Sequence, residues 1–123
     1  MKRILVVDDN QITTDLVETI LETSGYACIK ANNAKDCLEL IYNDKNTFDL
    51  ILLDLAMPNT SGVEILDQLK RDGLLDKHRL ALFTASSLSD VEKNGLKTLG
   101  ALDTMKKPFT KAALLEFVAR YAK

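Results

Sequence analysis

Five short apolar runs alternate with five amphipathic segments along this chain, and the alternation constrains the fold more than any other feature. The apolar runs predict strands at Arg3–Val7, Tyr26–Lys30, Asp49–Leu53, Arg79–Phe83 and Leu102–Met105. Near-continuous apolar runs are typical of parallel strands that are covered on both faces. Parallel strands need crossovers, and the amphipathic segments can supply them as helices. The sequence therefore predicts an α/β fold in which a parallel sheet lies between helices.

Each amphipathic segment begins at a residue that can cap a helix, because its side-chain oxygen can accept from the free N–H groups of the first turn. The five candidate N-caps are Asn10, Asn33, Ser61, Ser89 and Thr110. Both serines are followed three residues later by glutamate, which is the capping-box pattern. The apolar spacing predicts inward faces made of Ile12, Leu16, Val17, Ile20 and Leu21 in the first helix, and of Val91, Leu96 and Leu99 in the fourth.

We expect a single domain over residues 1–123, since 123 residues suffice for one core but not for two ordinary domains. With 16 basic and 18 acidic residues, the net charge of −2 lacks the positive excess that nucleic acid binding requires. The apolar run Ile4–Val7 is too short for a membrane span or a signal-peptide core, so a cytoplasmic protein without membrane contact is predicted. Cys28 and Cys37 show no CxxC pattern, which favours buried, reduced thiols over a disulfide or metal site.

Polar residues stand where four of the five predicted strands end. Asp8 and Asp9 follow the first strand, Asp54 the third, Thr84 the fourth and Lys107 the fifth. In open parallel sheets, ligands bind outside the carboxyl ends of the strands. Clustered carboxylates raise one another's pKa unless a cation neutralises them, Mg2+ prefers oxygen ligands, and an ammonium suits a phosphoryl group. Together these residues indicate a Mg2+-dependent phosphoryl site, although singly most are also ordinary cap or turn residues.

Two further residues that can carry a positive charge are predicted to lie outside the site. Successive residues of a strand face opposite ways, so Lys106 and Lys107 cannot both point into it, and we expect Lys106 to be solvated. His78 is the only histidine and lies between Lys77 and Arg79, so an exposed imidazole is predicted.

Six segments occur in a fixed order: Ile4–Asn10, Leu52–Pro58, Ser61–Gly62, Phe83–Ala85, Gly100–Ala101 and Lys107–Phe109. Together they resemble the receiver domain of two-component response regulators, including the single-domain chemotaxis-type regulators. The resemblance extends from Lys2 to about Ala122. It implies a flavodoxin-like (βα)5 fold, a three-layer sandwich around a parallel five-stranded sheet of order 2-1-3-4-5.

The resemblance also implies a role for each acidic residue. Asp54 matches the aspartate that accepts the phosphoryl group. Asp8 and Asp9 match the acidic pair that holds Mg2+ together with Asp54, and Ala56 matches the position whose backbone carbonyl completes the metal site. Mg2+ is the only cofactor implied.

A mechanism follows from these matches. Asp54 would take a phosphoryl group from the phosphohistidine of a sensor histidine kinase or a histidine phosphotransfer protein. Thr84 and Lys107 match the hydroxyl and the ammonium that contact the phosphoryl oxygens. Because an aspartyl phosphate is labile, the protein would also remove the group, acting as a signalling switch rather than as an enzyme with a separate substrate. Its downstream protein target is not identified by the sequence, and a monomer or a weak homodimer is expected.

One position departs from the family pattern. The fifth strand of a receiver normally carries an inward aromatic that swings when the hydroxyl moves, and the matching residue here is Thr104. A threonine is too small for that movement. We therefore hypothesise that displacement of the Ala85–Leu88 loop carries the signal.

Three other functions compete with that of a receiver switch. An enzyme of the haloacid dehalogenase type needs a second acidic residue two positions after its nucleophile, where this chain has Ala56. A flavodoxin-like cofactor binder would meet repulsion between its phosphate and Asp8 and Asp9. The third is a receiver-like adaptor with vestigial phosphorylation, which only a phosphorylation experiment can distinguish from a working switch.

Overall fold

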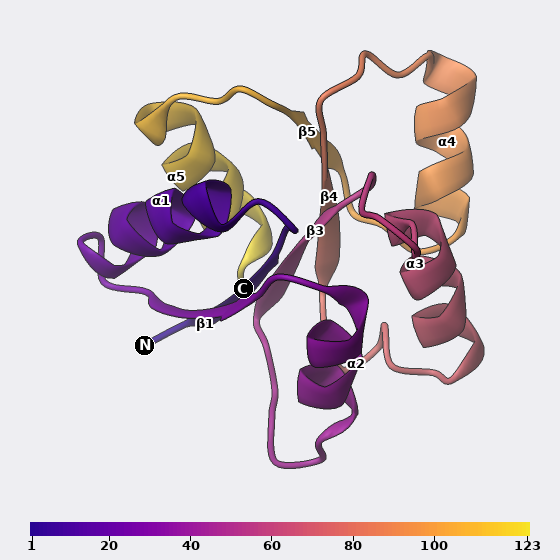
Figure 1. Cartoon of the computed structure of the whole chain (residues 1–123), viewed down its shortest axis with the longest axis horizontal. Coiled ribbons are helices and arrows are strands. Elements are labelled where there is room, and N and C mark those ends of the chain that lie inside the picture. The colour runs from indigo at the N-terminus through magenta and orange to yellow at the C-terminus, as the bar shows by residue number, and fades with distance from the viewer.

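Five parallel strands form one sheet in the order β2-β1-β3-β4-β5, which confirms the predicted fold class (Figure 1). The computed structural model describes all residues, 1–123. Its strands are β1 (Arg3–Val7), β2 (Ala27–Ala31), β3 (Leu50–Asp54), β4 (Leu80–Thr84) and β5 (Thr104–Lys106). The second, third and fourth strands begin one residue later than predicted, and β5 begins two later. Asp54 and Thr84 are consequently the last residues of their strands.

Five helices connect the strands, and each begins after a capped residue. They are α1 (Gln11–Glu22), α2 (Ala34–Tyr42), α3 (Gly62–Arg71), α4 (Asp90–Thr98) and α5 (Lys111–Tyr121). All five predicted N-cap side chains accept from backbone N–H groups of the first turn. The complete capping box forms only at Ser89, where Glu92 also accepts from the Ser89 N–H. None of the helices combines the length and apolarity that crossing a bilayer requires.

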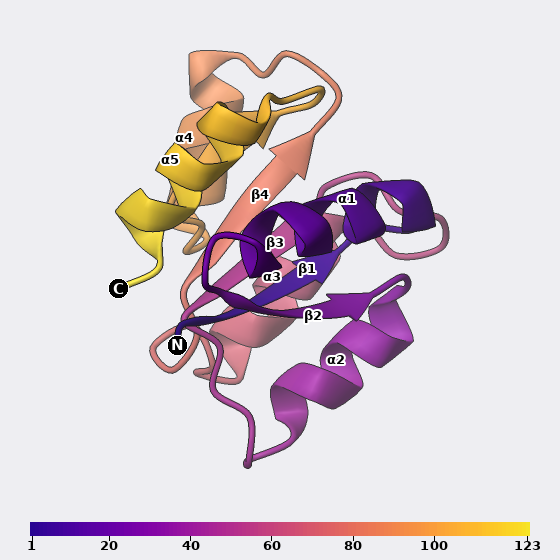
Figure 2. The same ribbon diagram turned by 90° about the vertical axis from the view of Figure 1, so that its left-hand side faces the viewer.

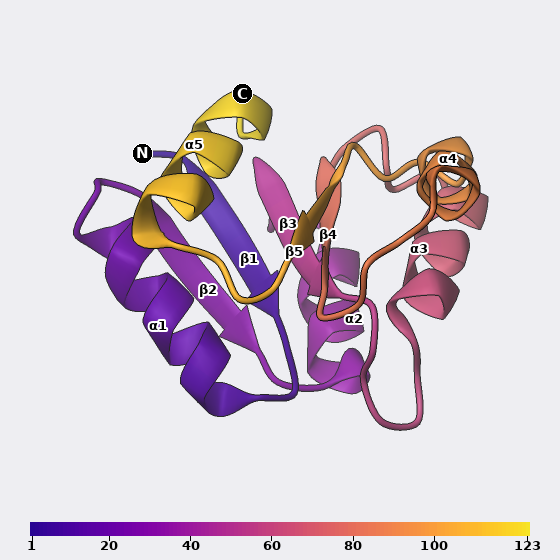
Figure 3. The same cartoon turned by 90° about the horizontal axis from the view of Figure 1, so that it is seen from above.

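The helices form two layers, with α1 and α5 on one face of the sheet and α2, α3 and α4 on the other (Figures 2 and 3). Alternate side chains of each central strand enter opposite cores. In β1, Leu5 and Val7 pack with the α2–α4 layer, whereas Ile4 and Val6 pack with α1 and α5. Both cysteines are buried and free, as predicted, and they belong to different cores.

Three side chains predicted to face inward lie on the surface instead. Ile12, Leu16 and Val91 are 80%, 51% and 82% exposed. The apolar residues that recur at the helix period of 3.6 residues form a wider face on α1 than the sheet can cover. The buried polar residue of α1 is Thr14, whose hydroxyl donates to the Gln11 carbonyl and accepts from Asn32.

His78 is fully buried, so the prediction that it is exposed was wrong. Its Nδ1 accepts from the Phe48 N–H at 3.0 Å, and the two rings lie 5.6 Å apart. The Arg3 guanidinium lies over the Phe48 ring, 5.1 Å from its centroid. A buried backbone N–H requires an acceptor, which the neutral imidazole supplies just before β3. The charged sequence neighbours of His78 carry no information about this long-range contact.

The burial of His78 predicts an acid-sensitive contribution to stability. Burial, and secondarily the charge of Lys77, lowers the pKa of His78 below its ordinary value. The unfolded chain therefore binds more protons, and the contribution is lost as the pH falls below about 6.5. At about pH 7 we expect His78→Leu to lower the free energy of unfolding by about 1–3 kcal/mol, because the Phe48 N–H loses its acceptor.

Urea unfolding at about pH 7 and about pH 5 measures both effects, because a histidine of the unfolded chain, with its ordinary pKa of about 6.5, becomes protonated between these pH values. The gap between wild type and His78→Leu should narrow at the lower pH, since only the wild type loses the histidine contribution. A gap that stays constant between the two pH values would contradict the role given to His78.

Candidate functional site

Three carboxylates meet at the edge of the sheet where β1 and β3 end. Asp8 and Asp9 follow β1 directly, and Asp54 ends β3. One carboxylate oxygen from each residue lies within 4.8 Å of the others. Asp8 and Asp54 are buried, whereas Asp9 is exposed. The turn after β1 thus brings two adjacent aspartates toward one site.

Local hydrogen bonds fix Asp8 and leave Asp9 unengaged. The Asp8 carboxylate accepts from the Asn10 N–H at 3.0 Å. Its backbone carbonyl accepts from the Asn32 side chain at 2.9 Å, and Asn32 also donates to Thr14. Asp9 makes no side-chain hydrogen bond or ion pair, so its carboxylate is available to a ligand.

Lys107, which directly follows β5, contacts both buried carboxylates at this edge of the sheet. Its ammonium lies 2.8 Å from Asp8 Oδ2 and 3.6 Å from Asp54 Oδ2. Its backbone N–H donates to the Thr84 carbonyl at 2.7 Å, and the Lys107–Pro108 peptide bond is cis. Burial opposes the charge, but the carboxylates of Asp8 and Asp54 raise the pKa of Lys107 above its ordinary value. The ammonium therefore supplies fixed positive charge beside Asp54.

Asp54 is an aspartate whose ionised form is disfavoured. Burial first, and the charge of Asp8 second, raise the pKa of Asp54. The Ala56 N–H, which donates to Asp54 Oδ1 at 3.3 Å, and the Lys107 ammonium act in the opposite direction. One ammonium faces three carboxylates, and a cluster of oxygen donors with excess negative charge suits a hard divalent cation. The residues present therefore fit Mg2+.

Thr84 shares this edge of the sheet but uses its hydroxyl locally. Its Oγ1 accepts from the Ser86 N–H at 3.0 Å and donates to the Ser86 carbonyl at 3.2 Å. It is buried at the end of β4, beside β3. Thr84 thus ends the strand next to that of Asp54, while its hydroxyl is committed to its own turn.

Sequence reasoning assigned no role to Gly62, the first residue of α3. Its N–H donates to the Leu55 carbonyl at 2.8 Å. A Cβ on Gly62 would lie 2.6 Å from the Asp54 carbonyl oxygen and 2.9 Å from the Leu55 Cα. The available signal was a glycine inside a helix start, where glycine has poor propensity. Gly62 lets α3 pack directly against the backbone that carries Asp54.

Solved receiver structures share this architecture. Chemotaxis protein CheY4 of Vibrio cholerae superposes with a TM-score of 0.87 at 26% identity, over 98% of both chains. A CheY-like receiver domain protein from Methanospirillum hungatei has a TM-score of 0.86 at 30% identity, over 98% of this chain and 92% of that one. A response regulator from Burkholderia pseudomallei, solved with a phosphorylated aspartic acid and a calcium ion, has a TM-score of 0.82 at 26% identity, over 100% and 67%.

Curated relatives are longer regulators. The phosphate regulon transcriptional regulatory protein PhoB of Pseudomonas aeruginosa is 38% identical over 114 residues, which are 93% of this chain and 48% of that protein. Regulatory protein VanR of Enterococcus faecium is 37% identical over 119 residues, or 96% and 47%. The chain thus spans about half the length of the curated relatives it matches. Residues 4–119 match the model of the response regulator receiver domain, and the chain belongs to that family.

Proposed function

We propose that residues 1–123 act as a phosphorylation-dependent switch, with Asp54 as the phosphoryl acceptor. The observation that carries the proposal is the buried Asp54 carboxylate, which lies among two further aspartates and 3.6 Å from the Lys107 ammonium. A carboxylate oxygen of Asp54 attacks the phosphorus of a partner's phosphohistidine, and the phosphorus–nitrogen bond breaks as the imidazole leaves. The product is an aspartyl phosphate. Water later attacks the phosphorus, releasing inorganic phosphate and restoring the carboxylate.

Asp8, Asp9, Asp54 and the Ala56 carbonyl are proposed to hold Mg2+. The ion, when bound, supplies charge that neutralises the phosphoryl oxygens. Lys107 contributes a second, permanent positive charge, which its contact with Asp8 orients. Ala56 donates its N–H to Asp54, so the carboxylate is held in place before the reaction.

Thr84 is proposed to couple the chemistry to a change of shape. Its hydroxyl has one proton, which it can donate either to the Ser86 carbonyl or to a phosphoryl oxygen. Donation to the phosphoryl group would release the Ser86 carbonyl and loosen the hold on the Ala85–Leu88 loop. A cavity of about 160 Å³ lies beside this loop, lined by Thr104 among others, where the family pattern has an aromatic.

The proposed docking site for the phosphohistidine partner is the α1 surface, which we define as Ile12, Leu16 and the adjoining Pro108 and Phe109. Ile12 and Leu16 are both exposed. Leu16 also lines a hollow of about 280 Å³ together with Lys107, Pro108 and Phe109. An exposed apolar patch beside the site suits a partner that must deliver a phosphoryl group to Asp54. Four further points remain predictions. They are an unidentified downstream protein target, a cytoplasmic location, no contact with nucleic acid or membrane, and a monomeric or weakly dimeric state.

Acetyl phosphate tests the proposed function without any partner. With Mg2+, intact-mass spectrometry of the wild type should show the addition of one phosphoryl group, and chelation of the metal should slow labelling on the order of 100-fold or more. Asp9→Asn should raise the Mg2+ concentration needed roughly tenfold or more. Asp76→Asn is the matched control, because Asp76 is exposed and its side chain makes no hydrogen bond or ion pair. A wild type that is never labelled would instead favour the adaptor with vestigial phosphorylation.

A further inference from the structure

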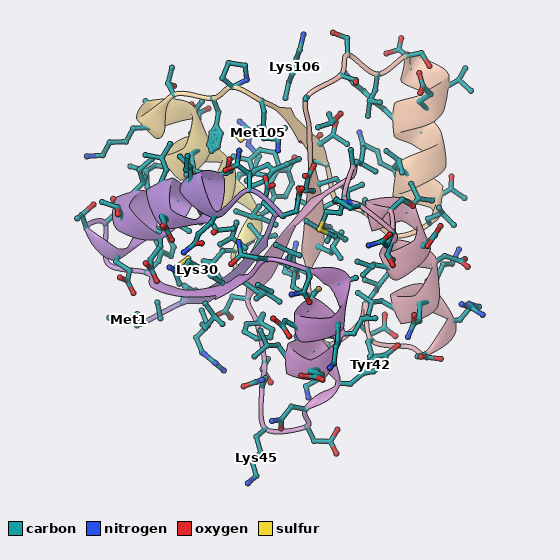
Figure 4. The ribbon with its side chains drawn as sticks, in the orientation of Figure 1. Met1, Lys30, Tyr42, Lys45, Met105 and Lys106 are labelled. Carbon is teal, nitrogen blue, oxygen red and sulfur yellow. The ribbon has the colours of Figure 1, made fainter.

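Every hydrogen bond made by residues 85–88, which lie between β4 and α4, involves a side chain. None of the four residues of Ala85–Leu88, called the switch loop below, takes part in a backbone–backbone hydrogen bond. One tie is the pair of bonds between the Thr84 hydroxyl and Ser86. The other is a bond of 2.8 Å from the Lys106 ammonium to Ser87 Oγ. Figure 4 shows Lys106 at the end of β5, beside the connection that leads to α4.

Adjacent lysines at the end of β5 thus serve opposite sides of the strand. Lys107 turns to the acidic cluster, whereas Lys106 turns to the switch loop. Lys106 is exposed, as predicted, but it is not merely solvated. A second lysine, Lys93, also lines the cavity beside the switch loop, and its ammonium makes no hydrogen bond or ion pair. Lys93 and Lys106 therefore both line the cavity, but only Lys106 bonds to the switch loop.

The geometry points to Lys106 as a positioning residue that holds the switch loop in its resting place, an inference that rests on the proposed function of Asp54. When the Thr84 hydroxyl turns to a phosphoryl oxygen, the Ser86 carbonyl loses its donor. The loop is then held by two polar ties, the bond from the Ser86 N–H to Thr84 Oγ1 and the bond from Lys106 to Ser87, and only the second comes from β5. Ser87 precedes the α4 cap, Ser89, by two residues, so the tie opposes displacement of the start of α4. Lys106 thus sets how readily the loop leaves its resting position in a receiver whose fifth strand lacks the aromatic.

Hydrogen exchange of the free protein tests the tie directly. The Ser86 amide is protected by Thr84, so its protection factor reports opening of the loop. Lys106→Met and Ser87→Ala should each lower that protection about twofold to fivefold, as an exposed charged hydrogen bond allows. The double variant should lose no more than either single one. Lys93→Met should match the wild type, and Lys106→Arg should restore protection. Unchanged protection in Lys106→Met, or additive losses in the double variant, would overturn the inference.

A phosphoryl analogue tests the role in switching. Beryllofluoride with Mg2+ should shift the amide resonances of Leu55 and Ala56, which directly follow Asp54, and those of the switch loop. Because loss of the tie destabilises the resting state, Lys106→Met should need about twofold to fivefold less analogue for half-saturation. Equal half-saturation in Lys106→Met, Lys93→Met and the wild type would overturn the switching role. Absence of any shift at Leu55 and Ala56 would count against Asp54 as the acceptor, whereas hydrogen exchange would still decide whether Lys106 holds the loop.

Discussion

Replacing Asp54 by asparagine is expected to lower the rate of labelling by acetyl phosphate by more than about 1,000-fold, because the neutral amide is a poor nucleophile. The amide can keep the shape of the side chain and the contact with the Ala56 N–H. The substitution also removes a carboxyl group whose ionisation is disfavoured, because burial and the charge of Asp8 raise the pKa of Asp54. The variant should therefore be at least as stable as the wild type near neutral pH while being inert.

Two measurements separate loss of the nucleophile from loss of the fold. Urea unfolding should give a free energy for Asp54→Asn no lower than that of the wild type, and Asp76→Asn should be labelled at the wild-type rate. Labelling of Asp54→Asn at the wild-type rate would mean that another residue accepts the phosphoryl group.

The second large effect is expected at Gly62. In Gly62→Ala, the new methyl group would lie 2.6 Å from the Asp54 carbonyl oxygen and 2.9 Å from the Leu55 Cα, both of which belong to the backbone. Relief of that overlap must move α3 or the end of β3, so we expect a loss of roughly 1–3 kcal/mol in the free energy of unfolding. Labelling by acetyl phosphate should slow as well, because Asp54 moves with its backbone.

Gly95 provides the matched control for this substitution. It lies inside α4, it is exposed, and a Cβ there would meet no atom within 4 Å. Gly95→Ala should therefore raise the free energy of unfolding by about 0.5–1 kcal/mol, through better helix propensity. Urea unfolding of the two variants should give changes of opposite sign. A Gly62→Ala protein as stable and as readily labelled as the wild type would contradict the close packing of α3 on the acceptor backbone.

The parts of the fold that the sequence predicted depend on local patterns. Apolar runs predicted the strands to within two residues, and cap side chains predicted all five helix starts. The convergence of Asp8, Asp9 and Asp54 followed because parallel strands present their carboxyl ends at one edge of a sheet. These predictions needed no knowledge of distant contacts.

The parts that the sequence missed depend on contacts between distant segments. His78 is buried because the Phe48 N–H, 30 residues away, needs an acceptor. Ile12 is exposed because the sheet covers less of α1 than the apolar period indicates. The bond from Lys106 to Ser87 joins two polar residues that would each be solvated in isolation. Gly62 acquires its role only when α3 packs on the Asp54 backbone.

The identity of the phosphorylated residue is the central claim, and reductive trapping tests it most directly. Wild-type protein labelled with acetyl phosphate and Mg2+ would be treated with borohydride, whose hydride converts an aspartyl phosphate to homoserine with release of phosphate. Peptide mapping by mass spectrometry then locates the homoserine. We predict homoserine at position 54 and at no other aspartate. Homoserine at Asp8 or Asp9, or its absence from a labelled protein, would contradict the assignment of Asp54 as the acceptor.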